Sequence, residues 1–512
     1  MGWGSLAVTL CEQEEASAWR AVANDVCNSQ SSSDQLVEEA DALASDSEGE
    51  VQPEPRAGFS EKVWWARQLE RHTLRLGYES PAAPRQPVNL VSCCSGAVSE
   101  GIVLKELGIP ARIISTSEPN SDYRCFQQAN HKVEHVFEFL SAQVAGNKCL
   151  LHKHEPGVPC KVPDRIDLMV VGSPCNPFSK LTKKRFHADS VQNHRLFDVT
   201  FKDVCESFQA FEPVAGIMEQ SAGFGMVVDC HTTETPLQRF LDVFKQLSFT
   251  KGGYWIVVIK TDLSEWINIS RERIYINFFR KDVYTREEAA KFKEIVKAVQ
   301  DRQRQEGCAS IARFFMEPDD PVLMADLERM KQESRNHGSA KQSGLCSWSV
   351  QVAEMKGKLG VSPMYEPVRC FKKWHLPGLE KNERIKAILN MAVCEKMKDM
   401  KKCASNVKKV SRELLVDVSQ NPARARMTNA SGLNFTLCTS TVAVHMGLQR
   451  LVVPREYLYL QGFPKTICLP DAVPLASIKK MAGEGMALPS LGLCVWCQYL
   501  LKGYKHDERI DD

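Results

Sequence analysis

Residues 166–180 read IDLMVVGSPCNPFSK, and this stretch decides the fold. Its first six residues include five apolar ones, a run that is typical of a strand buried on both faces in a parallel sheet covered by helices. Gly172 and Pro174 end the strand, so Cys175 lies at its carboxyl end, the edge where open α/β sheets bind ligands. The thiol is either a nucleophile or a small buried hydrophobic group, and this stretch alone favours the second interpretation.

The regions on both sides of this strand alternate between strand and helix patterns. Strands are predicted over 88–94, 111–118, 214–220, 254–262 and 273–279, and helices over 98–108, 120–131, 195–211 and 235–247. This alternation predicts an α/β fold with a doubly wound, mostly parallel sheet.

The alternation stops near residue 283, where long charged helical stretches begin. We therefore predict a second domain there and a return to the first domain near the end of the chain. The predicted units are an acidic disordered tail (1–56), a linker with an N-terminal helix (57–87), the first domain (88–282 and 433–505), the second domain (283–432) and a tail (506–512).

The charge of the chain is unevenly distributed. The net charge is +2, but residues 1–56 hold twelve acidic and two basic residues, which leaves +12 on the remainder. A basic body suits a polyanionic partner. No run of about twenty apolar residues predicts a membrane span. We expect the 19 cysteines to be reduced thiols of an intracellular protein with no membrane partner.

Two features at predicted strand ends suggest a nucleotide-like cofactor. The turn SCCSGAVSEG (92–101) has Gly96 and Gly101 where a helix begins, and a helix amino terminus favours polar or anionic groups. Glu118 ends the next strand, where nucleotide-binding α/β domains place a carboxylate on ribose hydroxyls. An ordinary surface acid is an equal alternative for Glu118.

Further polar groups at strand ends point to pyrimidine chemistry. Glu219 lies near the end of the predicted strand 214–220, and Arg271 and Arg273 lie in SRERIYI. Cytosine carbon 5 is too electron-poor to attack a methyl donor. It becomes nucleophilic when a thiolate such as that of Cys175 adds at carbon 6 while an acid protonates nitrogen 3.

At this point the sequence resembles the cytosine carbon-5 DNA methyltransferase family over about 88–281 and 436–500. GSPCNPFS resembles the family's Pro-Cys loop, MEQS its Glu-Asn-Val motif, SRERIYI its Gln-x-Arg-x-Arg motif and RLVVPREYLYLQGFP its ninth motif. The segments SCCSGAVSEGIVLKELGI and HRLFDVTFKDV are most similar to the eukaryotic de novo branch. The resemblance implies the class I S-adenosylmethionine-dependent methyltransferase fold, with the second domain recognising the target.

The resemblance also implies roles for individual residues. Cys175 would be the nucleophile in a loop shaped by Pro174, Glu219 would protonate the ring, Arg273 would hold the base carbonyl, and Arg271 would contact the base or a phosphate. Arg455 and Glu456 would support the junction between the domains. The residues implied to bind S-adenosylmethionine are Ser95, Gly96, Ala97, Glu118, Pro119, Ser173 and Glu484.

The sequence departs from the family pattern at several positions. CCSGA replaces the usual Phe-x-Gly-x-Gly, and GEGM, with Glu484, stands where the tenth motif has Asn. Gln220 and Ser221 replace the Asn and Val after the motif glutamate, and Ile269 replaces the leading Gln of the arginine motif. Only Glu138 offers an acid near the expected adenine-binding aspartate. A noncatalytic scaffold that binds DNA therefore remains an alternative to an active enzyme.

The expected substrate is double-stranded DNA with the target cytosine flipped out of the stack. Residues 368–426 hold fifteen Lys/Arg and six Asp/Glu, which suits phosphate contact. CFKKWH (370–375) faintly resembles the Cys-Phe-Thr motif of the tRNA-methylating branch, so tRNA is the second substrate candidate. Nuclear localisation is expected from the DNA substrate alone.

Two cysteine groupings have structural interpretations. Cys149, His152, His154 and Cys160 lie close together in the sequence, but their spacing fits no standard zinc pattern, so a polar loop is favoured and no metal site is predicted. Cys494 and Cys497 form a CxxC in an apolar helical stretch, which core packing explains.

Overall fold

The computed structural model describes most of the chain after residue 61. The described residues are 62–79, 84, 86–152, 160, 165–180, 187, 189–228, 233–336, 346–362, 367, 383–399, 410–412, 414–419, 426–429 and 431–502. The predicted acidic tail at 1–56 lies outside them.

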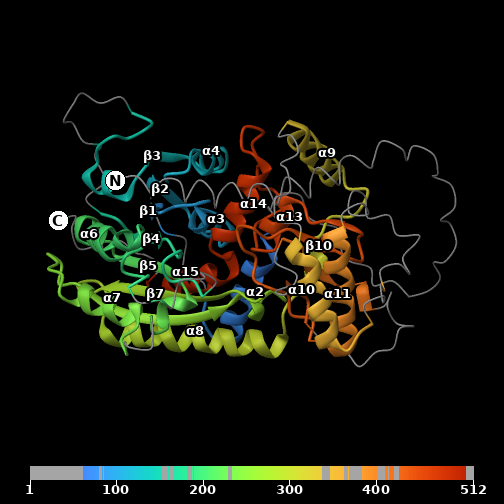
Figure 1. Ribbon diagram of the computed structural model, residues 1–512. Coiled ribbons are helices and arrows are strands. Elements are labelled where there is room, and N and C mark those ends of the chain that lie inside the picture. Colours follow the sequence, from blue (N-terminus) through green and yellow to red (C-terminus); the bar gives the residue numbers. More distant parts are fainter. Residues whose placement is uncertain are drawn as a thin grey trace, which may run out of the picture.

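A seven-stranded sheet forms the centre of the protein (Figure 1). Its strands are β1 (Val88–Cys93), β2 (Ala111–Ser117), β3 (Val133–Phe137), β4 (Leu168–Gly172), β5 (Ala215–Ser221), β6 (Tyr254–Asp262) and β7 (Glu272–Arg280). The order across the sheet is β3-β2-β1-β4-β5-β7-β6. β1 to β5 are parallel, and β7 runs antiparallel to β5 and β6. The predicted doubly wound, mostly parallel sheet of the class I methyltransferase fold is confirmed.

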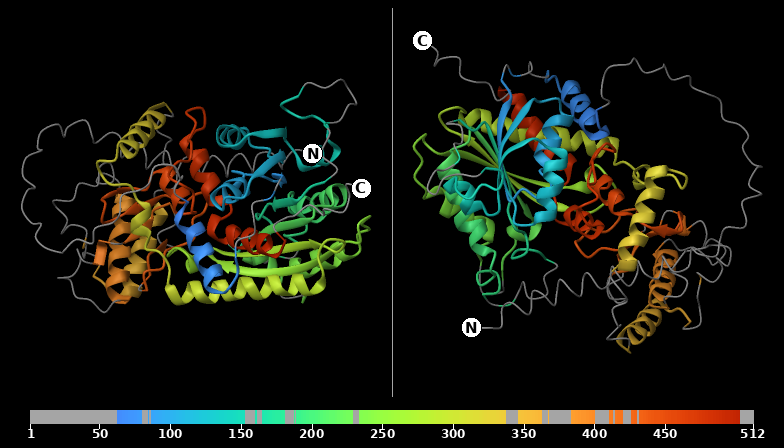
Figure 2. Two further views of the ribbon diagram at one scale, coloured as in Figure 1. Left: turned by 180° about the vertical axis from the view of Figure 1, so that it is seen from behind. Right: turned by 90° about the horizontal axis from the view of Figure 1, so that it is seen from above.

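Both faces of the sheet are covered, because its central strands are apolar on both sides. In β4, Leu168 and Val170 belong to one buried cluster, whereas Met169 and Val171 belong to another on the opposite face. The first face packs on α2 (Trp64–Arg75), α3 (Ser99–Glu106), α8 (Arg286–Glu306) and α15 (Leu488–Lys502). The second face packs on α5 (Leu140–Ala145), α6 (Val204–Phe211) and α7 (Pro236–Lys245). Figure 2 shows these helices on the two sides of the sheet.

One strand of the large sheet was not predicted from the sequence. β3 is a five-residue edge strand whose middle residues Glu134 and His135 are polar and only partly buried, so it lacks the apolar run of the central strands. The predicted helix over 195–211 is present as a π-helical turn, Val199–Asp203, followed by α6.

The segment after residue 283 begins with α8, which packs along β6 and α15. The start of the second domain at 283 therefore stays a prediction, and the packing of α8 favours a later boundary. Beyond α8 lie α9 (Pro321–Asn336), α10 (Cys346–Leu359) and α11 (Glu383–Asp399). In Figure 1, α10 and α11 lie at the end of the molecule opposite α6.

A small antiparallel sheet, order β11-β10-β8-β9, follows α11 in the chain. Its strands are β8 (Leu415–Asp417), β9 (Arg426–Met427), β10 (Ala443–His445) and β11 (Arg450–Leu451). The chain then returns to the large sheet through α13 (Pro454–Tyr459), α14 (Leu475–Glu484) and α15. Much of the basic segment 368–426, including CFKKWH, lies outside the described residues. Within the described part of the chain, no helix is long and apolar enough to cross a membrane.

Candidate active site

Cys175 lies in the loop that follows β4, and this loop is held against β5. The Gln220 side-chain amide donates hydrogen bonds to the carbonyl oxygens of Ser173 and Pro174, at 3.1 Å each, and to the Ser173 hydroxyl at 2.9 Å. A Cβ at Gly223 would lie 1.9 Å from the Phe178 carbonyl oxygen, so only glycine permits this close approach. The loop is therefore positioned by buried contacts with β5 and the turn after it.

Glu219 and Arg273 form an ion pair on the adjacent strands β5 and β7. Arg273 Nε lies 2.6 Å from Glu219 Oε1, and both side chains are nearly buried, at 12% and 6% exposure. Burial raises the pKa of the Glu219 carboxyl above its ordinary value, and the Arg273 and Arg271 guanidiniums oppose that shift. A carboxyl in this state can hold a proton at a higher pH than an exposed glutamate does.

The Cys175 thiol lies within the electrostatic field of this pair. Burial raises the pKa of the thiol, and the positive charge of Arg273 is the largest opposing influence. Glu219 and Glu484 also raise this pKa, whereas Arg271 lowers it. The tertiary structure thus brings together four of the predicted site residues around one thiol, and these are Glu219, Arg271, Arg273 and Glu484.

Arg271 occupies a different position from Arg273, although only one residue separates them. Arg271 is 1% exposed, and its guanidinium donates hydrogen bonds to the carbonyl oxygens of Leu437 at 3.1 Å and Gly483 at 2.9 Å. Burial lowers its pKa to about 10. These contacts join β7 to the return segment (433–505), where the chain comes back to the large sheet, so they favour a positioning role for Arg271. Its predicted contact with the base or a phosphate stays a prediction.

The turn between β1 and α3 has an unusual backbone. Cys94, Gly96 and Val98 have positive φ angles of 51°, 50° and 53°. Such a conformation is rare for a β-branched residue such as Val98, and strained positions of this kind cluster at functional sites. The Gly96 N–H donates to Glu118 Oε2 at 2.9 Å, and a Cβ at Gly96 would meet open space. The turn therefore places backbone polar groups and a carboxylate beside an accessible volume.

Glu118 lies at the carboxyl end of β2, as predicted. Its second oxygen accepts a hydrogen bond from the Asn120 N–H at 2.9 Å, and its own N–H donates to the Phe137 carbonyl oxygen at the end of β3. Burial raises the pKa of Glu118 to about 7, against these hydrogen bonds, and the neighbouring Glu484 adds to the increase. Glu138, the acid considered for adenine binding, follows directly after β3 and is exposed.

The return segment completes this edge through α14. Glu484 Oε2 accepts a hydrogen bond from the Tyr123 hydroxyl at 2.8 Å, and the Ser477 hydroxyl donates to Asp122 at 2.6 Å. Two residues of α4 (Ser121–Asn130), the helix that follows β2, therefore attach α14 to this helix. The sequence offered no signal for Tyr123, since a tyrosine in a helix is usually only part of the core.

The other predicted cofactor residues lie along the same edge in different environments. Ser95 is buried, its hydroxyl donates to Ser92 O and it accepts from the Ser117 N–H. Ala97 and Ser173 are buried, and Pro119 is exposed. No contact with a cofactor tests these four assignments, so they stay predictions.

Two residues of the ninth motif contact the segment assigned to the second domain. Arg455 Nε donates to Asp326 of α9 at 2.7 Å, and the fully buried Glu456 accepts from the Met316 N–H at 2.9 Å. Arg450 also pairs with Glu456, at 2.7 Å. These contacts are consistent with the supporting role expected for Arg455 and Glu456.

Comparisons with known proteins add a family assignment. The sequence model of the family described as C-5 cytosine-specific DNA methylase matches residues 123–491. A search of curated proteins returned no match.

Several solved structures are similar to the chain in architecture. One is the Schizosaccharomyces pombe Dnmt2 methyltransferase (S. pombe; 12% identity, 81% of this chain and 98% of that chain, TM-score 0.38). A second is a putative DNA modification methyltransferase encoded within an Escherichia coli prophage (13% identity, 81% and 99%, TM-score 0.42). A third is the Entamoeba histolytica methyltransferase EhMeth (12% identity, 82% and 100%, TM-score 0.42).

Proposed function

The chain belongs to the C-5 cytosine-specific DNA methylase family, and from this premise we propose that it methylates cytosine in double-stranded DNA through a covalent Cys175 adduct. The observation that carries the proposal is the meeting of the Cys175 thiol with the Glu219–Arg273 pair at the carboxyl ends of β4 and β5. A thiol, a carboxyl of raised pKa and a guanidinium are the three groups that activation of a cytosine ring requires.

The proposed reaction assigns one task to each group. The Cys175 thiolate adds to carbon 6 of cytosine, and the electron pair of the 5,6 double bond is displaced through the ring. Glu219 donates a proton to nitrogen 3, which turns the ring into an enamine with a nucleophilic carbon 5. Carbon 5 then takes the methyl group that S-adenosylmethionine, when bound, would supply, and the electron pair of the broken bond stays on the donor sulfur as a neutral thioether. A base removes the carbon 5 hydrogen as a proton, and the 5,6 double bond re-forms as the thiolate leaves and nitrogen 3 returns its proton to Glu219.

Arg273 would hold the cytosine carbonyl oxygen while its ion pair keeps the Glu219 carboxyl oriented. The same guanidinium opposes the effect of burial on the Cys175 pKa, so it favours the thiolate that must attack. Arg271 would act indirectly, because its hydrogen bonds hold β7 to the return segment. Gln220 would position the loop that carries Cys175.

The family implies S-adenosylmethionine as the methyl donor, and the residues at this edge fit such a group. Glu118 presents a buried carboxylate suited to ribose hydroxyls, and the Gly96 turn faces open space beside it. Glu484 and the backbone around Ser95 would complete the site. When bound, the cofactor supplies an electrophilic methyl group.

A cytosine inside a duplex cannot reach the partly buried Cys175 thiol, so the base would leave the stack. The net charge of +12 outside residues 1–56 supports attraction to a polyanion. A DNA substrate would place the protein in the nucleus or in another compartment that contains DNA.

Trapping on a fluorinated substrate tests the proposal. Fluorine at carbon 5 blocks the final proton removal, so wild-type protein with S-adenosylmethionine should stay attached to a duplex containing 5-fluorocytosine in denaturing electrophoresis. Cys175→Ala should abolish the shifted band. Cys468→Ala, which changes an exposed cysteine, should retain it.

Two other results would redirect the proposal. A cofactor-dependent band on fluorocytosine-substituted tRNA, with none on DNA, would make tRNA the substrate. The absence of a band on both nucleic acids, together with no thermal shift on adding S-adenosylmethionine, would support a noncatalytic DNA-binding scaffold.

A further inference from the structure

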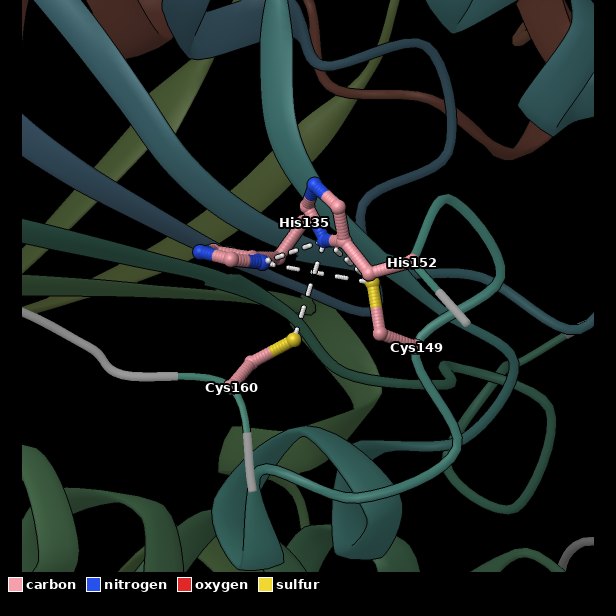
Figure 3. A group of neighbouring side chains, drawn as sticks. All are labelled: His135, Cys149, His152 and Cys160. Atoms are coloured by element: carbon pink, nitrogen blue, oxygen red, sulfur yellow. Dashed lines mark hydrogen bonds between the residues drawn. The ribbon is translucent and has the colours of Figure 1, made fainter. Parts of the chain in front are cut away.

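A cluster of sulfur and nitrogen side chains lies at β3 and is not used by the reaction proposed above. His135 extends from β3, and Cys149, His152 and Cys160 come from the chain that follows α5 (Figure 3). One nitrogen or sulfur atom from each side chain lies within 4.8 Å of all the others. Figure 3 shows the four side chains converging on one point from separate parts of the chain.

Four of the six separations between these atoms lie close to those of ligands around a single ion. The two imidazole Nδ1 atoms of His135 and His152 lie 3.1 Å apart. His152 Nδ1 lies 3.4 Å from Cys149 Sγ and 3.8 Å from Cys160 Sγ, and His135 Nδ1 lies 3.9 Å from Cys149 Sγ. Zinc bonds of about 2.3 Å to sulfur and about 2.0 Å to nitrogen place tetrahedral ligand atoms about 3.3 to 3.8 Å apart.

The kind of ligand selects the metal. The group holds two thiols and two imidazoles and no carboxylate, a set that suits zinc and is unsuited to magnesium or calcium. Four protein ligands fill a tetrahedral shell, which is the arrangement of structural rather than catalytic zinc. We propose that His135, Cys149, His152 and Cys160 form a structural zinc site at the edge of the sheet.

The backbone holds the ligands in place through contacts that do not involve a metal. The Leu150 N–H donates to Val136 O of β3 at 2.8 Å, which places Cys149 beside the strand. The Cys160 N–H donates to Gly146 O at 2.7 Å, just after α5. Cys149 and Cys160 are buried, whereas His152 is exposed. The site is thus largely formed by the fold, and its exposed histidine provides an entry path for the ion.

The ion would link this edge to the proposed cofactor carboxylate. Phe137 of β3 is fully buried in a small cluster with Cys149 and Cys160, and its carbonyl oxygen accepts the Glu118 N–H at 3.0 Å. Zinc at this position would hold β3 in register with the end of β2. This coupling rests on the proposed function, whereas binding of the metal does not.

The sequence did not reveal the site because one ligand lies far from the rest. His135 precedes Cys149 by fourteen positions and belongs to a strand that was itself not predicted. His154, the second histidine considered from the sequence, lies outside the described residues.

Metal analysis of the full chain tests the proposal. Protein reconstituted with zinc under reducing conditions and dialysed against metal-free buffer should contain about one zinc per chain. Cys149→Ser and Cys160→Ser should each lose most of it. Cys468→Ser is the matched control, since it alters an exposed cysteine outside the cluster, and it should retain the metal.

A second pair of variants separates metal binding from folding. His152 is exposed, so His152→Ala should leave the fold intact while it weakens zinc retention at least tenfold. His152→Cys should retain zinc, because three thiolates and one imidazole also form a tetrahedral zinc site. Cobalt added to the wild-type protein should give the intense visible absorption of a tetrahedral ion and a thiolate-to-cobalt charge-transfer band.

Three outcomes would overturn the site. They are wild-type protein without zinc after reconstitution, zinc content unchanged in both cysteine variants, and a Cys149–Cys160 disulfide found by mass spectrometry in metal-free native protein. A cysteine variant that loses zinc but still traps on fluorocytosine DNA would support the site and leave the proposed function intact.

Discussion

Cys175 and Cys160 are both thiols beside the same sheet, yet their neighbours differ in kind. Burial raises the pKa of both, that of Cys160 to about 11 with a contribution from the adjacent Cys149. Around Cys175 stand two guanidiniums and two carboxyls, which can move protons and hold a polar substrate. Around Cys160 stand a second thiol and two imidazoles, which can share one soft metal ion.

The difference teaches that burial alone does not assign a role to a cysteine. A nucleophile needs positive charge that favours its thiolate and an acid for the substrate, whereas a metal ligand needs further neutral or thiolate ligands at tetrahedral distances. Two further cysteines, Cys494 and Cys497, are fully buried in α15 within the apolar core, which confirms their predicted packing role.

The largest expected effect comes from removing one thiol at a time, at Cys175 or at the proposed zinc site. Cys175→Ala should lower methyl transfer at least about 10³-fold, because alanine cannot form the adduct, while its zinc content stays that of the wild type. Cys149→Ser should lose zinc but keep cofactor-dependent trapping on DNA. On the same preparations, a radiolabelled assay measures methyl transfer and metal analysis measures the zinc content. If Cys175→Ala transferred methyl groups at a rate within tenfold of the wild-type rate, Cys175 would not be the nucleophile, and the distinction between the two thiol sites would be lost.

The next largest effect concerns the acid beside Cys175. Glu219→Gln should lower kcat by about 10²- to 10³-fold, because the amide cannot donate the proton that nitrogen 3 requires. Glu272→Gln is the matched control, since Glu272 begins the neighbouring strand β7 and pairs with the exposed Lys180. Single-turnover kinetics compare the two variants. Equal rates in both would show that Glu219 has no part in proton transfer.

The proposed cofactor carboxylate Glu118 and the proposed zinc site should respond to pH in opposite directions. Rising pH should remove the stability that Glu118 contributes, whereas falling pH should release zinc. The folded pKa of Glu118 is about 7, above its ordinary value of 4.5, so the folded state binds more protons between these values. Its contribution to stability is complete below pH 4.5 and is lost as the pH rises through 7. Zinc should instead dissociate as the pH falls, because protons compete for its ligands.

Thermal unfolding of cofactor-free protein measures the Glu118 effect. Glu118→Gln should reduce the loss of unfolding free energy between pH 5 and 8, by up to about 3 kcal/mol. Glu100 is also buried with a pKa of about 7, so it leaves a residual slope in the variant. An unchanged slope in Glu118→Gln would show that the carboxyl is already ionised throughout this range.

The smallest effect concerns the attachment of the Cys175 loop. Gln220→Ala removes the hydrogen bonds to Ser173 and Pro174, and it should lower kcat about tenfold with little change in the KM for DNA, because the loop loses its fixed geometry. Gln220→Asn, which restores the usual residue of the family motif, should recover part of the rate. Steady-state kinetics distinguish this positioning effect from a loss of binding, which would raise KM instead.

The central fold could be predicted from local pattern. Six of the seven strands of the large sheet follow apolar runs long enough to be recognised, and Cys175, Glu118 and Glu219 each stand where such a run ends. β3 was missed because an edge strand needs no apolar run, and β8 to β11 were missed because two or three residues carry no periodicity.

The sequence by itself determined the parallel sheet, the strand-end position of the thiol and the family, because all three depend on residues close together in the chain. Only the tertiary structure separated buried Arg271 from Arg273 beside Glu219, since the partners of Arg271 lie more than 160 positions away. It also brought His135 to Cys149, His152 and Cys160. Contacts between distant segments depend on how the layers pack, and no spacing along the chain records that arrangement.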